Sequence, residues 1–109
     1  MTKKPPSPFG YYFSYLDKVD KNVKDTQEFG SMLILGMVEE LGEMSRAYLA
    51  KHGRKPRNIA AQEDETYERE LGDLLVSVLR LARIKDIDLD DALMYSLRKI
   101  EKRKNNPKR

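Results

Sequence analysis

The feature that most constrains the fold of this chain is a long helical pattern, residues 27–52, that is apolar on two sides. Thr26 is a favourable N-cap before it, and Gly53 stands where a helix commonly ends. At about 100° per residue, one side carries Met32, Gly36 and Ala47, and the other carries Ile34, Met37, Leu41, Met44 and Tyr48. Such a helix must be covered on both sides, by other helices of its own chain or by a second subunit.

Three further segments show helical periodicity, and no segment shows the period-two alternation that is typical of strands. These predicted helices run from about residue 9 or 11 to 23, from about 60 or 62 to 84, and from 88 to about 104. The last is the best defined at its start, because Asp88 can cap it and Asp91 stands three residues later. The sequence therefore predicts an all-α fold, a bundle of about four helices.

The length of 109 residues suits a single domain, residues 1–109, with flexible tails expected at 1–8 and 105–109. The chain has no cysteine and one histidine, His52, which excludes thiolate sites, disulfide frameworks and His-rich metal sites. No segment approaches the roughly 20 apolar residues that span a bilayer, and a cytoplasmic, reducing compartment is expected. A lone chain this short buries only roughly 60–70% of the surface that it exposes when unfolded, so association with a second copy is expected to enlarge the core.

Two groups of carboxylates interrupt the apolar helix faces. Glu39, Glu40 and Glu43 lie within about 100° of arc on the second predicted helix. Glu70 and Asp73 are one turn apart on the third, so the two groups face each other if these helices pack antiparallel. Each close pair of like charges costs on the order of several kcal/mol unless a proton or a divalent cation is bound. An all-oxygen donor set favours Mg²⁺, with Mn²⁺ as an alternative.

Other interpretations of these charges remain open. Most glutamates on helices are simply solvated, and Glu43 could pair with Arg46 on the next turn. A role near a helix start is expected for Glu63, Asp64, Glu65 and Glu68. The basic segments 51–57 and 98–109 suit an anionic ligand but also nucleic acid, and the first could be a mobile arm that closes over such a ligand.

The two acidic motifs resemble the signature of a known family. "EELGE" (39–43) and "ELGD" (70–73) are similar to the E-E-x-x-E … E-x-x-D signature of the MazG-like nucleoside triphosphate pyrophosphohydrolases. This family belongs to the all-α NTP pyrophosphatase superfamily. The resemblance extends over roughly residues 28–105, through "GDLLVSVLRLARIKDIDLDDAL" and the basic "LRKIEKRKN". It implies an all-α fold and Mg²⁺-dependent cleavage of a (d)NTP between the α- and β-phosphates to a (d)NMP and pyrophosphate.

Residue by residue, the resemblance implies Mg²⁺ coordination by Glu40, Glu43, Glu70 and Asp73. Glu39 would be an additional ligand or would orient the attacking water, and Lys99 and Arg103 would contact phosphates. The expected assembly is a homodimer or a dimer-of-dimers tetramer, without membrane or specific nucleic-acid partners. The chain lacks the Trp-containing motif of many family members, so base and sugar preference are not predicted.

Two alternatives to this function remain. A phosphoribosyl-ATP pyrophosphatase-like enzyme would have similar acidic clusters and a different substrate pocket. A non-catalytic helical module would instead bind nucleic acid or a protein partner through its basic ends, with salt sensitivity and no metal requirement.

Overall fold

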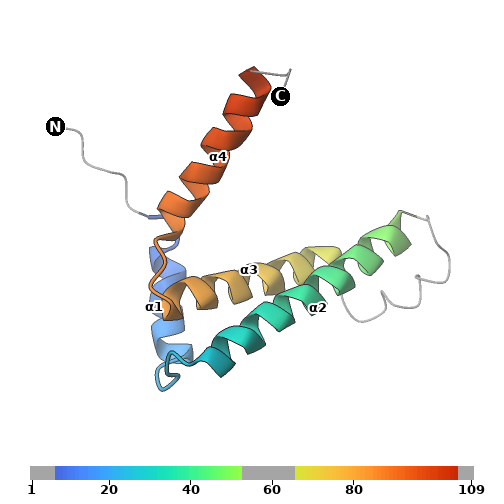
Figure 1. Cartoon of the computed structure of the whole chain (residues 1–109). Helices are drawn as coiled ribbons and strands as arrows, with labels where there is room; N and C mark the ends of the chain where they lie inside the picture. Colours follow the sequence, from blue (N-terminus) through green and yellow to red (C-terminus); the bar gives the residue numbers. More distant parts are fainter. Residues whose placement is uncertain (1–6, 53–65, 106–109) are drawn as a thin grey trace.

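The computed structural model describes residues 7–52 and 66–105, and within these ranges it consists of four α-helices without strands (Figure 1). The helices are α1 (Gly10–Val19), α2 (Gln27–Lys51), α3 (Tyr67–Ile84) and α4 (Leu89–Asn105). The predicted all-α fold is therefore confirmed. The predicted tails fall largely outside the described residues, although Asn105 is the last residue of α4. None of the described helices combines the length and the apolar character needed to cross a membrane.

Side-chain caps set where the helices begin, as predicted for α2 and α4. The Phe29 amide donates to the Thr26 hydroxyl at 3.1 Å at the start of α2. The Asp91 amide donates to the Asp88 carboxylate, also at 3.1 Å, at the start of α4. Each bond satisfies one of the amides that a helix N-terminus leaves without an intrahelical acceptor.

Two predicted helix boundaries were wrong. α3 begins at Tyr67 rather than near residue 60, because Thr66 is extended and its hydroxyl accepts a bond from the Arg69 amide at 3.3 Å. The predicted first turns at 60–65 lie outside the described residues. α1 ends at Val19 rather than at residue 23, because Asp20 leaves the helical conformation and caps the helix.

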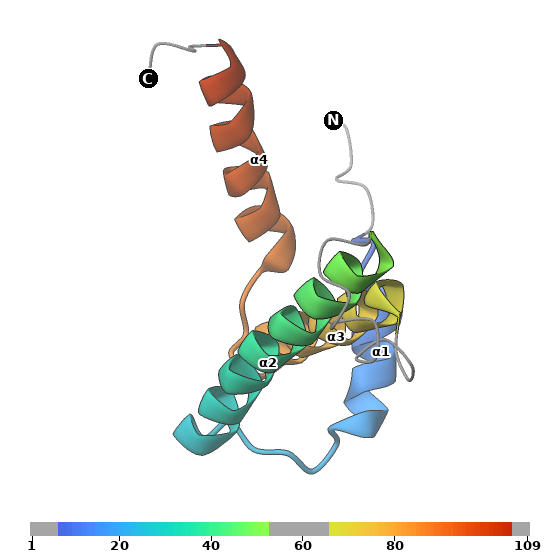
Figure 2. The same ribbon diagram turned by 90° about the vertical axis from the view of Figure 1, so that its right-hand side faces the viewer.

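The main packing contact joins α2 and α3, which run antiparallel, while α1 crosses the C-terminal half of α3 (Figures 1 and 2). The buried apolar side chains of the described residues are Leu16, Leu33, Ala47, Leu79 and Ala82. Ala47 of α2 is only 3% exposed. The packing of α2 on α3 brings together the side chains that project between the two helices.

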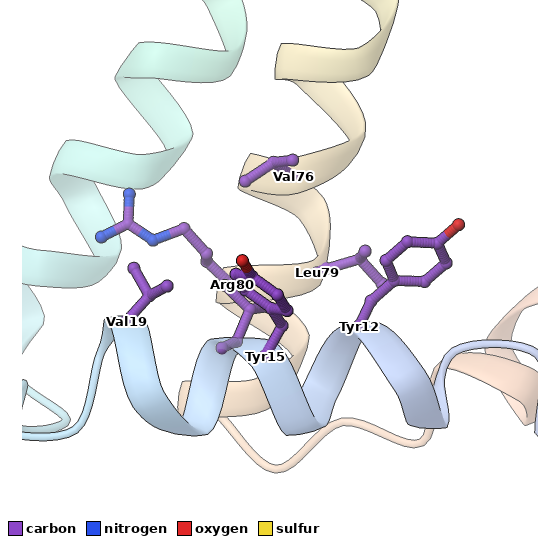
Figure 3. Close-up of a pocket in the computed structure, with 7 residues that line it drawn as sticks. Tyr12, Tyr15, Val19, Val76, Leu79 and Arg80 are labelled. Carbon is purple, nitrogen blue, oxygen red and sulfur yellow. The ribbon is translucent and has the colours of Figure 1, made fainter.

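An ion pair fastens the end of α1 to α3. Arg80 donates from Nε and Nη2 to the two carboxylate oxygens of Asp20, at 2.8 and 3.0 Å. Asp20 is only 3% exposed, and its hydrogen bonds raise the pKa of Arg80 above its usual value. Beside this pair, a cavity of about 350 Å³ lies between α1 and α3. Its lining residues include Tyr12, Tyr15 and Arg80 (Figure 3).

Among the described residues, most of helix α4 lies apart from the other helices, and only its start, at Leu89 and Leu93, lines a cavity with residues of α1 and α3. It leaves the end of α3 and projects away from α2 and α3 in both views (Figures 1 and 2). It has no buried residue, and its exposed apolar side chains include Leu93, Met94, Leu97 and Ile100. The four predicted helices are therefore present, but within one chain α4 does not join the packed group of the other three.

Candidate metal centre

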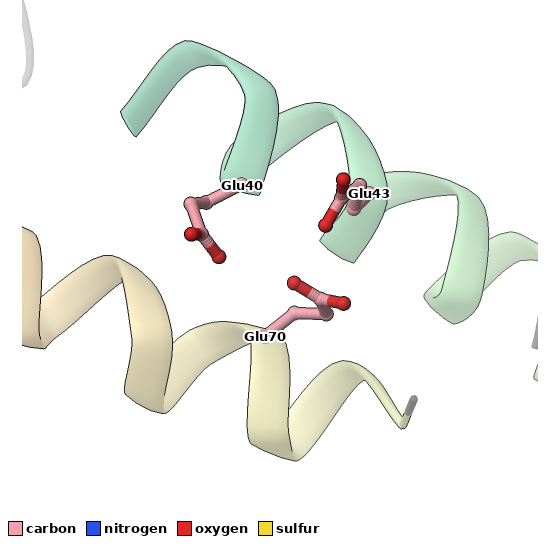
Figure 4. A group of neighbouring side chains, drawn as sticks. All are labelled: Glu40, Glu43 and Glu70. Atoms are coloured by element: carbon pink, nitrogen blue, oxygen red, sulfur yellow. The ribbon is translucent and has the colours of Figure 1, made fainter. Parts of the chain in front are cut away.

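Three carboxylates meet between α2 and α3. Glu40 and Glu43 of α2 point toward Glu70 of α3 (Figure 4). Each offers a carboxylate oxygen, and these three oxygens lie within 4.8 Å of one another. The antiparallel pairing of α2 with α3, together with the helical spacing of the acidic residues, accounts for this meeting.

The three carboxylates are buried to different extents. Glu70 is 4% exposed, Glu40 is half-buried and Glu43 is exposed. The Glu70 amide donates to the Thr66 carbonyl at 3.1 Å, which places Glu70 in the first turns of α3. The positive end of the α3 dipole therefore favours a negative charge at this position.

Neighbouring negative charges act on Glu40. Burial raises the pKa of Glu40, and the charge of Asp73 raises it further. Glu43 and Glu39 act in the same direction, whereas a hydrogen bond with Glu70 lowers the pKa. Asp73 and Glu39 are exposed and lie outside the group of three oxygens, but Asp73 is close enough to act on Glu40. Four other acidic residues thus act on the pKa of Glu40, and the five together form the acidic cluster of this site.

Two arginines of α3, Arg80 and Arg83, pair with aspartates on the α1 side rather than with the acidic cluster. Arg80 binds Asp20, and Arg83 donates to Asp17 of α1 at 2.8 Å. Both arginines therefore lie on the side of α3 that faces α1. A bound cation is a direct way to relieve the repulsion within such a group of carboxylates.

The donor set fits a hard divalent cation. Carboxylate oxygens are the ligands that Mg²⁺ prefers, and an Mg²⁺ ion with ligands at about 2.1 Å holds them roughly 3–4 Å apart. The oxygens of Glu40, Glu43 and Glu70 lie within 4.8 Å of one another, so small side-chain rotations would close them on an ion. The exposure of Glu43 leaves one side of the group open to solvent and to a ligand.

The predicted phosphate-binding residues lie on a different part of the chain. Lys99 and Arg103 are exposed on α4, and the fold of a single chain does not bring them to the carboxylates (Figure 1). The ammonium of Lys99 lies 5.1 Å from the ring centre of Tyr95 on the same helix. The basic segment 51–57 falls mainly outside the described residues.

Sequence reasoning missed an aromatic patch near the carboxylates. The rings of Tyr48 and Tyr67 meet edge to face with 5.2 Å between their centres, and the His52 ring lies tilted against Tyr48 with 4.3 Å between the ring centres. The two tyrosines line a cavity of about 350 Å³ between the end of α2 and the start of α3. The one available signal was the position of Tyr67, one helical turn before Glu70.

The repulsion around Glu40 leads to a stability prediction. Without divalent ions, Glu40→Gln is expected to raise the free energy of unfolding by about 0.5–1 kcal/mol, since solvent screens only part of the repulsion. Urea unfolding in chelator measures this change. Glu28→Gln, in the first turn of α2, is the control and is expected to lower stability slightly by weakening the dipole interaction. A destabilised Glu40→Gln protein in chelator would contradict the predicted repulsion.

Comparison with known proteins agrees with the acidic motifs. The family described as the MazG nucleotide pyrophosphohydrolase domain matches residues 28–107. The uncharacterized protein YpjD of Bacillus subtilis (strain 168) is 39% identical over 56 residues, which are 51% of this chain and 50% of that protein. The match thus spans half the length of this relative. No solved structure gives a significant match. The match over residues 28–107 shows that the chain belongs to the MazG nucleotide pyrophosphohydrolase domain family.

Proposed function

We propose that this protein is a Mg²⁺-dependent pyrophosphohydrolase that cleaves a (d)NTP between its α- and β-phosphates. Membership of the MazG family supports a nucleotide substrate and hydrolysis to pyrophosphate. The observation that carries the metal dependence is the meeting of Glu40, Glu43 and Glu70 between two helices. Mn²⁺ has similar ligand preferences and is expected to replace Mg²⁺.

Each carboxylate has a role in this proposal. Glu40, Glu43 and Glu70 hold the ion, and Asp73 completes the ligand set from the next turn of α3. Glu39 serves as an additional ligand or orients the attacking water. When bound, the metal supplies positive charge that offsets the carboxylates and polarises the phosphate oxygens. Without that charge, the acidic residues would repel the triphosphate.

The proposed reaction needs no covalent intermediate. The oxygen of a water molecule bonds to the α-phosphorus while the anhydride bond to the β-phosphate oxygen breaks. The products are a (d)NMP and pyrophosphate, and the proton of the water passes to a nearby carboxylate or to solvent. Lys99 and Arg103 would stabilise the charge that develops on the phosphate oxygens, which is the usual role of cations in phosphoryl transfer.

A substrate panel tests this proposal. The purified protein is incubated with each (d)NTP in Mg²⁺ or in excess chelator. Phosphoribosyl-ATP is included to test the alternative function of a phosphoribosyl-ATP pyrophosphatase-like enzyme. Equal amounts of nucleoside monophosphate and pyrophosphate are expected with Mg²⁺, and neither product with chelator. Release of orthophosphate and a nucleoside diphosphate would show cleavage between the β- and γ-phosphates and would contradict the proposal. Turnover that persists in chelator would contradict the role of the carboxylates.

The basic surface of α4 favours a second candidate, a helical module that binds nucleic acid. Its exposed cations include Arg98, Lys99, Lys102, Arg103 and Lys104. Such a module would bind RNA or DNA in chelator, with an affinity that falls steeply as salt increases. Fluorescence anisotropy with a labelled oligonucleotide separates the two candidates, because the enzyme is expected to show no such binding at physiological salt.

We also propose that the protein is at least a homodimer. The described residues of one chain leave the second apolar side of α2 largely uncovered, with Ile34 52% exposed and Leu41 49% exposed. Exposed apolar surface of this extent is typical of a subunit contact. Sedimentation at micromolar concentration is expected to give a dimer or a dimer-of-dimers tetramer, and a monomer would contradict the proposed contact.

A further inference from the structure

The cavity between α1 and α3 has an aromatic wall that the proposed reaction does not use. Its volume of about 350 Å³ lies within the range of small-molecule sites. Tyr12 and Tyr15 line it from α1, and Val76, Leu79 and Arg80 line it from α3 (Figure 3). The two tyrosines are 53% and 61% exposed, so a flat ligand can reach their rings from solvent.

This cavity lies on the side of α3 that carries part of the acidic cluster. At about 100° per residue, Val76 lies about 60° from Asp73 around α3, and Arg80 lies about 20° from it. Along the helix axis, the two residues stand about 4.5 and 10.5 Å beyond Asp73. A ligand that extends along this side of α3 therefore passes from the carboxylates to the tyrosines of α1 within the length of one nucleotide.

The other aromatic cavity, which Tyr48 and Tyr67 line, is on a different side of the helices. Tyr48 lies about 140° from Glu43 around α2, and Tyr67 lies about 120° from Asp73 around α3. Because the two tyrosines line one cavity, that cavity opens on the side of the α2–α3 pair away from Glu43 and Asp73. The cavity at α1 is therefore better placed for a ligand whose phosphates lie at the acidic cluster.

The lining of the cavity at α1 suits an uncharged aromatic group. Leu16 and Leu79 are only 7% and 8% exposed and give the cavity a firm apolar wall. Arg80 is the one charged residue that lines it, and this guanidinium is already bound to both carboxylate oxygens of Asp20. The cavity therefore offers little to an anion, whereas its rings can stack on any nucleobase, because every base has a π-face.

We infer that Tyr12 and Tyr15 form the nucleobase subsite of this protein. The base packs against the two rings of α1 while the α-phosphate lies at the acidic cluster. This inference rests on the proposed function for the presence of a nucleotide. Apart from the two tyrosine hydroxyls and Arg80, the side chains that line the cavity are apolar. The subsite therefore discriminates weakly between bases, because apolar contacts separate similar ligands less well than hydrogen bonds do.

A binding comparison tests this subsite. The probes are the α,β-methylene analogues of dATP and dCTP, which cannot be cleaved at that bond, and inorganic triphosphate, which has no base. Titration calorimetry in Mg²⁺ measures their affinities. Tyr15→Ala is expected to weaken the binding of both analogues about 5- to 100-fold, because a stacking contact is lost, and to leave the affinity for inorganic triphosphate unchanged.

A tyrosine of the same helix provides the control. Tyr11 is 74% exposed and does not line the cavity, so Tyr11→Ala is expected to bind all three probes as the wild type does. Equal affinity of Tyr15→Ala and the wild type for the analogues would overturn the inference. It would also be overturned if Tyr15→Ala lost as much affinity for inorganic triphosphate as for the analogues, since the effect would then not concern the base.

Steady-state kinetics give an independent readout. Tyr15→Ala is expected to raise KM for the (d)NTPs by a similar factor with a smaller change in kcat, because a base contact is made equally in the ground and transition states. Tyr15→Phe keeps the ring and is expected to stay close to the wild type. A Tyr15→Phe protein as impaired as Tyr15→Ala would rule out stacking as the cause.

The remaining outcomes separate the subsite from the proposed function and from a subunit contact. Binding of the analogues that depends on Tyr15, without release of pyrophosphate from any (d)NTP, would support the subsite and contradict the proposed function. No binding of either analogue to the wild type would overturn the subsite. A smaller sedimenting species for Tyr15→Ala than for the wild type would show that a second copy covers the cavity, which would also overturn it.

Discussion

The Glu43→Gln protein is expected to lose roughly 10²–10³-fold or more in kcat/KM, because a proposed metal ligand is lost. Glutamine keeps the size of the side chain but removes the negative charge that the ion needs. Because Glu43 is exposed, the helices should form as in the wild type. Pyrophosphate release at saturating Mg²⁺ measures the loss, and far-ultraviolet circular dichroism checks the helix content.

A matched control separates this effect from a general loss of charge. Glu68 is an exposed carboxylate near the start of α3, 3.7 Å from the ammonium of Lys51. It lies outside the carboxylate group between α2 and α3. Glu68→Gln is expected to keep nearly all of the wild-type activity. Equal activities of the two variants, whether both high or both low, would count against a metal site built around Glu43.

The second large effect concerns stability. Asp20→Ala is expected to lower the free energy of unfolding by about 2–4 kcal/mol, because it leaves the half-buried guanidinium of Arg80 without its partner. Arg80 is held between Asp20 and the ring of Phe29, which lies 5.3 Å from the guanidinium carbon. Loss of the aspartate therefore leaves the positive charge against an apolar surface. Urea unfolding monitored by circular dichroism measures the change.

The neighbouring pair provides a control of the same chemistry. Asp17 accepts a hydrogen bond from Arg83, but its side chain is 67% exposed. Asp17→Ala is expected to cost less than about 1 kcal/mol, since solvent screens an exposed ion pair. If both alanine variants lost the same free energy, the burial of Asp20 would not be the cause of its effect.

The sequence was most informative where the pattern depends on one helix alone. The period of the apolar residues predicted four helices, and the caps at Thr26 and Asp88 predicted two of their starts. The start of α3 at Tyr67 was missed because the residues before it, 60–65, have a helical pattern too. The cap at Thr66, whose hydroxyl accepts from the Arg69 amide, sets the start instead. A single hydrogen bond of this kind outweighs weak helix propensities.

Features that depend on how helices pack were less accessible. Spacing placed Glu40 and Glu43 on one face, but the approach of Glu70 depends on the rotation of α3 about its axis. The aromatic pair of Tyr48 and Tyr67 depends on the register between the same two helices. The outward direction of α4 depends on Asp86, where the sequence offered no glycine to indicate a left-handed cap.

The most direct measurement is a Mn²⁺ titration followed by electron paramagnetic resonance, with no nucleotide present. The wild-type protein is expected to bind the ion stoichiometrically, and Glu43→Gln and Glu70→Gln are each expected to weaken that binding severely, while Glu68→Gln leaves it unchanged. Binding that is absent from the wild type, or equally strong in all three variants, would contradict a divalent metal held between α2 and α3.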